Sequence, residues 1–123
     1  MRISEAESVV MEVLWRRHTP QSAEDIVAAT AARQDWQEAT VKTLLNRLLR
    51  KKAIAAERDG RRYLYLPRVK RSDYVHAESK NLLDRLYGGR VAPLVLHFAQ
   101  RMKLTARDIA EIRALIEELD HER

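Results

Sequence analysis

The sequence has no cysteine, and only three glycines and three prolines among its 123 residues. The missing cysteine excludes disulfides, thiol catalysis and thiolate metal sites. No apolar run approaches the ~20 residues of a membrane span. No basic start leads into an apolar stretch with a small-residue cleavage site, so a secretory signal is not predicted. We therefore expect a cytoplasmic protein.

The chain has a net positive charge, which is concentrated in one segment. Lysine and arginine outnumber aspartate and glutamate by 23 to 18, which gives a net charge of +5. Residues 36–71 contain 11 basic and 3 acidic side chains, a balance of +8, whereas residues 1–35 sum to −2 and residues 72–123 to −1. Such a focused positive field on a small module predicts a nucleic-acid binder. A solvated basic face without a partner is the alternative.

A chain of 123 residues normally forms one domain, or one small domain with an appendage, and the pattern along this chain predicts two small, mainly α-helical modules. Hydrophobic residues make up 46% and charged residues 33% of the chain, which suits a core beneath a well-solvated helical surface. We expect residues 1–71 to form three helices with a β-hairpin, and residues 72–123 to form three further helices. Because domains of about 60 residues are marginal alone, one of them is expected to gain stability from a partner chain.

The first helix is predicted from a capping signal followed by an apolar face. Ser4 and Glu7 have the spacing of a capping box, and Ser22 with Asp25 repeats it before a second helix. Trp15 is expected to close the apolar face of the first helix as a core residue. That face is formed by Val9, Val10, Val13 and Leu14.

The third helix is predicted over Glu38–Lys52, and its two faces differ in character. The buried stripe is Val41, Leu44, Leu45 and Leu48. At ~100° per residue, the opposite face and its flanks hold Ala39, Thr40, Lys42, Thr43, Asn46, Arg47 and Arg50. Small residues permit close approach to a major groove ~12 Å wide, where Asn pairs with adenine and Arg with guanine or phosphate. The alternative is an ordinary amphipathic helix with a solvated face.

A basic hairpin is predicted directly after this helix. Ile54–Arg58 and Arg61–Leu66 have strand character, and Asp59-Gly60 is expected to be the two-residue turn with both φ angles positive. A hairpin with a basic tip after a recognition helix indicates the winged variant of helix-turn-helix. The candidate phosphate contacts are Lys42, Lys51, Arg58, Arg61 and Arg62. The strand tyrosines, Tyr63 and Tyr65, are expected to pack on the sheet.

The C-terminal helices, predicted over about 72–87, 91–102 and after Thr105, have more apolar surface than some 50 residues can bury. The third capping box, Thr105 with Asp108, opens the last helix. A twofold partner with the same patch would bury it, which predicts a homodimer. Packing onto the first domain is the alternative. The predicted dimerisation residues are Leu82, Leu86, Leu94, Phe98, Ile109, Ile112, Leu115, Ile116 and Leu119.

No constellation of catalytic residues is present, so we do not expect an enzyme. No motif arranges Ser, His and Asp as nucleophile, base and orienting group, and no glycine-rich phosphate loop occurs. The histidines His76, His97 and His121 are scattered, and His76 with Asp73 or Glu78 is only a weak metal signal. We therefore predict no cofactor and no metal.

Several ordered segments together resemble the penicillinase repressor family (BlaI/MecI type). The segments extend over essentially the whole chain. Each one alone is a weak match to the family, but their order and spacing together are specific. The segments are Ile3–Glu7, Val10-Met11, Leu14-Trp15, Trp36, Thr40-Val41, Thr43-Leu44, Arg47-Leu48, Lys51-Lys52, Gly60-Arg61, Tyr63, Tyr65–Pro67, Ser72–Tyr74 and Val95–Phe98.

The resemblance implies a transcriptional repressor that binds double-stranded operator DNA. It implies a winged-helix DNA-binding domain, a helical dimerisation domain and a homodimer on a dyad operator. In the best-known members a membrane sensor with a metalloprotease domain detects β-lactams and triggers cleavage of the repressor, which would correspond to the His97-Phe98 bond here. The cleaved bond of the family commonly follows Asn, whereas this chain has His97. The rival interpretation is a winged-helix adaptor that binds protein and has no specific DNA site.

Overall fold

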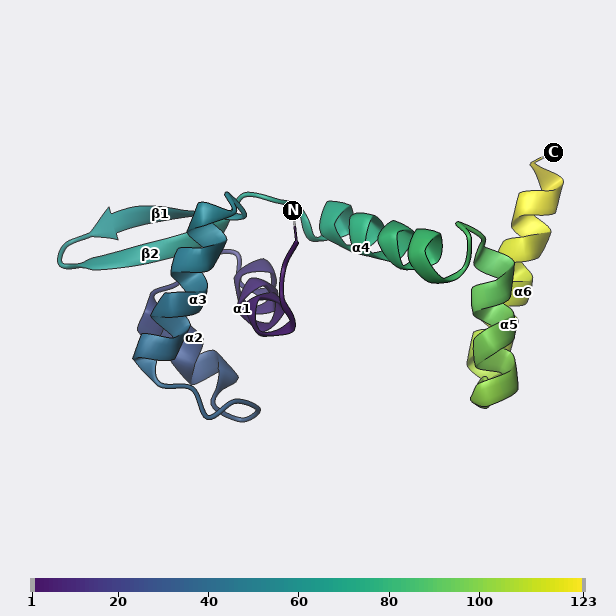
Figure 1. Ribbon diagram of the computed structural model, residues 1–123, viewed down its shortest axis with the longest axis horizontal. Helices are drawn as coiled ribbons and strands as arrows, with labels where there is room; N and C mark the ends of the chain where they lie inside the picture. Colours follow the sequence, from purple (N-terminus) through teal and green to yellow (C-terminus); the bar gives the residue numbers. More distant parts are fainter. Residues whose placement is uncertain (1, 123) are drawn as a thin grey trace. The chain divides into compact units, whose positions relative to one another are not determined.

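The computed structural model describes residues 2–122, which form six helices and a two-stranded antiparallel hairpin (Figure 1). Contacts divide the chain into a first unit, Met1–Val75, and a second unit, His76–Arg123. The division lies inside α4, four residues beyond the predicted domain boundary at residue 71. In chain order the elements are α1 (Glu5–Arg16), α2 (Ala23–Thr30), α3 (Glu38–Arg50), β1 (Ile54–Asp59), β2 (Arg62–Pro67), α4 (Arg71–Leu86), α5 (Val91–Arg101) and α6 (Ala106–His121).

Reciprocal capping boxes begin three of the helices, as predicted. The Glu7 amide donates to Ser4 Oγ, and the Ser4 amide donates to Glu7 Oε1, both at 3.1 Å. The same exchange between Ser22 and Asp25 opens α2, and between Thr105 and Asp108 it opens α6. Each box satisfies backbone donors that a helix leaves unpaired at its start, so the positions of these starts follow from local sequence.

Helix α3 ends at Arg50, two residues earlier than predicted, because Lys52 adopts a left-handed conformation with φ of 63°. The Ala53 amide donates to the carbonyl of Leu48, and the Lys52 amide donates to that of Leu49, each at 3.0 Å. These two bonds form a Schellman-type termination, in which glycine is the usual left-handed residue. Lys52 therefore has a backbone conformation that its own Cβ disfavours.

The hairpin turn differs from the prediction by one residue. Asp59 pairs with Arg62 across the hairpin, so the two turn residues are Gly60 and Arg61, and the predicted Asp59-Gly60 turn is wrong. Gly60 has φ of +65°, whereas Asp59 and Arg61 do not have positive φ. A turn with glycine at its first central position is the alternative two-residue solution for a hairpin. This shift places Arg61 at the apex.

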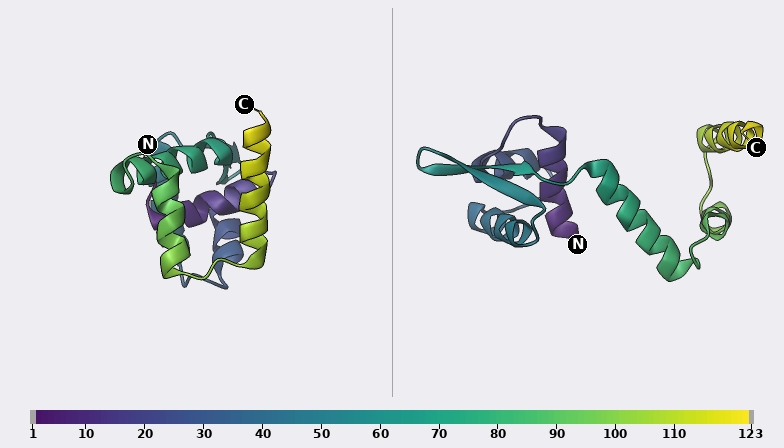
Figure 2. Two further views of the ribbon diagram at one scale, coloured as in Figure 1. Left: turned by 90° about the vertical axis from the view of Figure 1, so that its right-hand side faces the viewer. Right: turned by 90° about the horizontal axis from the view of Figure 1, so that it is seen from above.

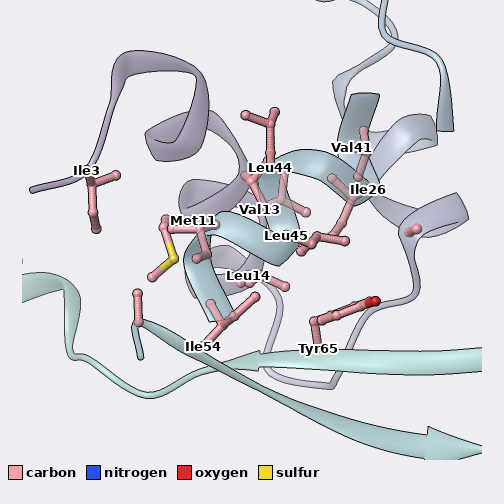
Figure 3. Close-up of a cluster of buried hydrophobic side chains, with 14 residues drawn as sticks. Ile3, Met11, Val13, Leu14, Ile26, Val41, Leu44, Leu45, Ile54 and Tyr65 are labelled. Atoms are coloured by element: carbon pink, nitrogen blue, oxygen red, sulfur yellow. The ribbon is translucent and has the colours of Figure 1, made fainter. Parts of the chain in front are cut away.

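The core of the first unit lies between the three helices and the hairpin, where side chains from all of them converge (Figure 3). Tyr65 on β2 is buried in it, whereas Tyr63 is 47% exposed. The segment between α1 and α2 joins the sheet through Gln21, whose amide and carbonyl bond to those of Tyr65 at 2.9 and 2.7 Å. The buried hydrophobic residues are Ile3, Val10, Met11, Val13, Leu14, Ala23, Ile26, Val41, Leu44, Leu45, Leu48, Ala53, Ile54 and Tyr65.

The second unit has a different character, since α5 and α6 contain no buried residue in the described part of the chain, and neither does α4. Helix α4 stops at Leu86, where Gly88 and Gly89 take positive φ and the Gly89 amide returns to the Leu83 carbonyl at 2.8 Å. Helices α5 and α6 run antiparallel (Figure 2). None of the helices described is both long and apolar enough to cross a membrane.

Candidate nucleic-acid interface

The outer face of α3 carries exposed polar side chains opposite its buried stripe. Thr43 donates from Oγ1 to the Ala39 carbonyl at 3.0 Å. Within residues 2–122, the side chains of Asn46, Arg47 and Arg50 have no hydrogen-bond or ion-pair partner, so their donors are available to a ligand. The exposed residues on this face, all of them predicted, are Thr40, Thr43, Asn46, Arg47 and Arg50.

A hollow of about 390 Å³ joins the starts of α2 and α3 to the hairpin. Lys42 enters it from α3, and its amine lies 3.4 Å from Glu38 on the same helix. Because both side chains are about half exposed, this pair is weak and easily exchanged for another anion. The hollow thus brings together three predicted phosphate contacts from two elements: Lys42, Arg61 and Arg62.

The hairpin uses two of its three arginines internally. Arg62 donates from Nε and Nη2 to Asp59 Oδ2, both at 3.3 Å. Arg58 donates from Nε to the Gly60 carbonyl at 3.2 Å and from Nη1 to Tyr63 Oη at 3.3 Å. Its Cζ also lies 5.4 Å from the centroid of the Tyr63 ring, a cation–π distance. These contacts brace the hairpin tip and fix where its positive charge is held.

Arg61 is the exception among the hairpin arginines. It lies at the apex, is exposed, and has no polar partner in the part of the chain that the structure describes. Its five donors are therefore free, whereas Arg58 and Arg62 must give up or share a protein contact to bind an anion. The one-residue shift of the turn, which sequence rules did not predict, is what puts Arg61 there.

Lys51 has a partner on another helix. Its amine lies 2.7 and 2.8 Å from the two carboxylate oxygens of Glu7, which is only 2% exposed, and Lys51 itself is 35% exposed. The pair ties the C-terminal end of α3 to the N-terminal end of α1. Lys51 does not line the hollow that Lys42, Arg61 and Arg62 share. Any phosphate contact by Lys51 would have to be made alongside this bond.

Glu7 is a structural residue whose second role the sequence analysis missed. Burial by itself raises the pKa of Glu7, but hydrogen bonds from Lys51 and Ser4 outweigh burial and hold the pKa below its ordinary value of 4.5. A signal was present, since Glu7 lies on the buried stripe of α1 with Val10, Met11 and Leu14. An acid on such a stripe indicates a buried partner.

The predicted dimerisation residues lie on the helices of the second unit and remain open to solvent in the single chain. Leu94 and Ile112 are half-buried, and the others are exposed by 37–60%. Phe98 is 40% exposed, and the His97 ring meets its ring edge-on with centroids 5.1 Å apart. Apolar grooves lie between α5 and α6. The exposed members are Leu82, Leu86, Phe98, Ile109, Leu115, Ile116 and Leu119.

The described residues contain no cluster of three His, Asp or Glu side chains that could hold a metal ion. The weak signal at His76 accordingly gains no third ligand. The candidate site that the structure presents is a surface of hydrogen-bond donors and basic side chains on α3 and the hairpin.

Known proteins share both the sequence and the winged fold. The penicillinase repressor of Bacillus licheniformis is 32% identical over 117 residues, covering 95% of this chain and 91% of that protein. The methicillin resistance regulatory protein MecI of Staphylococcus aureus is 32% identical over 114 residues, covering 93% and 92%. The solution structure of monomeric Bacillus licheniformis BlaI in complex with the blaP half-operator matches with a TM-score of 0.51 at 31% identity, covering 60% of this chain and 89% of that one. Residues 3–118 match the family described as penicillinase repressor. The chain therefore belongs to the penicillinase repressor family.

Proposed function

We propose that this repressor binds a dyad-symmetric operator as a homodimer, with α3 in the major groove and the hairpin on the adjoining backbone. The observation that carries the proposal is the outer face of α3, where Asn46, Arg47 and Arg50 are exposed and free of protein partners. The hollow beside it gathers the basic side chains of two elements. A helix that offers hydrogen-bond donors, next to a hollow in which three basic side chains outnumber Glu24 and Glu38, has the chemistry needed to bind double-stranded DNA.

The residues of this surface divide into two roles. Thr43, Asn46 and Arg47 are assigned to base edges, with Thr40 and Arg50 at the margins of the same face. Lys42, Arg61 and Arg62 are assigned to phosphates, and Arg61 is the freest of them. Arg58 and Lys51 act first as braces of the hairpin and of α3, and contribute their charge to the field.

Dimerisation is assigned to the second unit. Its three helices bury no residue within the described chain, although they carry most of the large exposed hydrophobic side chains. A second copy would present the same face, and a twofold interface between the two would remove both from water. The operator would then be read by two copies of α3 related by the same axis.

The regulated genes are proposed from the relatives. The similar proteins are named as a penicillinase repressor and a methicillin resistance regulator, which supports control of β-lactam resistance genes. Cleavage at His97-Phe98 by a protease or membrane-sensor pathway would cut α5 within the proposed dimerisation unit and relieve repression. Mass spectrometry of the repressor in cells exposed to a β-lactam would detect a fragment ending at His97. A full-length chain throughout derepression would contradict this switch.

DNA binding is tested by its salt dependence on operator DNA selected from a random duplex library. If the dimer neutralises roughly 6–10 phosphates, affinity falls on the order of 10³–10⁵-fold between 50 and 200 mM salt. Replacing Asn46 should cost discrimination against random DNA by about 1–3 kcal/mol, whereas replacing Arg61 should weaken both DNAs alike and shallow the salt slope. A flat salt dependence would contradict DNA binding and favour a protein-binding adaptor.

A further inference from the structure

The segment that follows the hairpin is fastened to α1 by an indole. Trp15 donates from Nε1 to the carbonyl of Val69 at 2.9 Å, a bond between residues 54 positions apart. Trp15 and Val69 are both half-buried and pack against the core. An indole has one hydrogen-bond donor, and that of Trp15 binds the backbone of the segment that follows β2.

The first turn of α4 is held on the same side of α1 by two further contacts. The Tyr74 ring lies 5.3 Å from the Trp15 ring between centroids, with a 38° angle between their planes. Arg71 donates from Nε to both carboxylate oxygens of Glu12, at 3.0 and 3.2 Å. Because Glu12 and Trp15 are three residues apart on α1, they lie on one face of that helix.

Together these three contacts fix the start of α4 on α1 more firmly than any one of them would. An exposed ion pair such as Arg71 with Glu12 contributes little by itself. The hydrogen bond to Val69, however, fixes the approach to α4, and the ring and ion-pair contacts hold its first turn at two points. The first unit accordingly extends to Val75, which is inside α4. The helix that leads into the proposed dimerisation unit thus begins as part of the DNA-binding unit.

We propose that Trp15 is a positioning residue for operator recognition, because it fixes the direction in which α4 leaves the DNA-binding unit. The inference rests on the proposed homodimer and its dyad operator. Half-site spacing is a geometric property, and each inserted base pair turns one half-site by roughly 35° relative to the other. When the start of α4 is fixed on α1, the two α3 helices of a dimer lie at one defined spacing. When it is not fixed, the spacing varies, and the effective concentration of the second α3 at its half-site is lower.

The test uses full-length Trp15→Phe, which keeps an aromatic ring beside Tyr74 but loses the donor to Val69. Binding is measured to a selected dyad operator, to a single half-site cut from it, and to dyads with one or two base pairs added or removed between half-sites. Half-site affinity should stay within about 2-fold, while the dyad is bound on the order of 10-fold more weakly, equivalent to about 1.4 kcal/mol. The variant should also discriminate less between dyads of different spacing. Trp36→Phe, the other tryptophan and also packed against the core, is the matched control.

A second variant keeps the test decisive if Trp15→Phe folds poorly. Glu12→Gln removes the ion pair to Arg71 and should shift the spacing preference in the same direction but less, whereas Glu111→Gln, in the comparable exposed pair with Arg107 on α6, should not. Equal losses on half-site and dyad would overturn the positioning role in favour of simple packing, and so would an unchanged spacing preference in both variants. If the wild-type chain itself bound the dyad no better than the half-site, the proposed dimeric function would be the part that fails.

Discussion

The two units of this chain both contain three helices, but they differ in how much of their hydrophobic side chains they bury. The first unit buries a continuous hydrophobic core between α1, α2, α3 and the hairpin. The second has none of its helical residues buried in the described chain, although Leu115, Ile116 and Leu119 line one side of α6. Hydrophobic burial is the dominant favourable term in folding. The first unit therefore contains its own source of stability, whereas the second presents an apolar surface that the proposed homodimer would bury.

The largest expected effect is in the core of the first unit. Leu45→Ala removes a fully buried side chain and should destabilise that unit by about 2–5 kcal/mol, because the cavity it leaves relaxes only in part. Leu115→Ala, at a position exposed in the single chain, should leave the unfolding of the first unit unchanged. Urea unfolding followed by tryptophan fluorescence reports on this unit, since Trp15 and Trp36 both lie in it. Similar losses for both variants would remove the contrast between the units.

The second effect is on association. Leu115→Asp puts a carboxylate into the proposed dimer interface and should weaken the dimer roughly 100-fold, about 3 kcal/mol, because a desolvated charge has no partner there. Ala114→Asp adds the same charge one residue away, on the polar side of α6, and is the control. Sedimentation equilibrium over a range of protein concentration measures both. A Leu115→Asp chain as dimeric as its control would move the interface elsewhere.

The third effect is that of the buried Glu7–Lys51 pair. Glu7→Gln should destabilise the first unit by about 1–3 kcal/mol at neutral pH, since Lys51 then loses its charged acceptor. The pKa of folded Glu7 is lowered from 4.5, so its contribution is full above that pH and is lost as pH falls through the folded value. The difference from wild type should therefore shrink below about pH 4.5. Glu5→Gln, at an exposed glutamate of the same helix, should show no comparable difference at any pH.

The smallest effect has the opposite sign. Lys52→Gly should stabilise the first unit by about 1 kcal/mol, because glycine adopts the left-handed conformation at this helix end without the Cβ penalty. Lys52→Ala keeps the Cβ and should give no such gain. Thermal unfolding of the two variants side by side makes the comparison, and a gain shared by both would attribute it to removal of the lysine charge instead.

Local signals in the sequence predicted much of the fold, because they act over a single turn of helix. The capping boxes at Ser4, Ser22 and Thr105 located three helix starts, and the stripe of α3 was predicted residue by residue. The resemblance to penicillinase repressors, and with it a transcriptional repressor and not an enzyme, is confirmed by the family match over residues 3–118. Periodicity and spacing report only on residues that are neighbours on the same helix or strand.

The features that the sequence did not predict depend on pairing between distant segments. Dipeptide preference favoured Asp59-Gly60 as the turn, but pairing of Ala56 with Tyr65 and of Asp59 with Arg62 puts the turn at Gly60-Arg61. Likewise, the bonds of Trp15 to Val69 and of Glu7 to Lys51 join residues without any shared period. The groove and phosphate residues of α3 and the hairpin stay predictions, since their roles are decided only when DNA is bound.

In the proposed function, DNA recognition belongs to the first unit and dimerisation to the second. The most direct measurement is the affinity of full-length Leu115→Asp for a single half-site and for the dyad operator, beside wild type under the same salt. We expect an unchanged half-site affinity and the loss of the higher affinity for the dyad, because two DNA-binding units are then no longer joined. Wild-type affinity for the dyad, or loss of half-site binding by a variant whose first unit is folded, would contradict it.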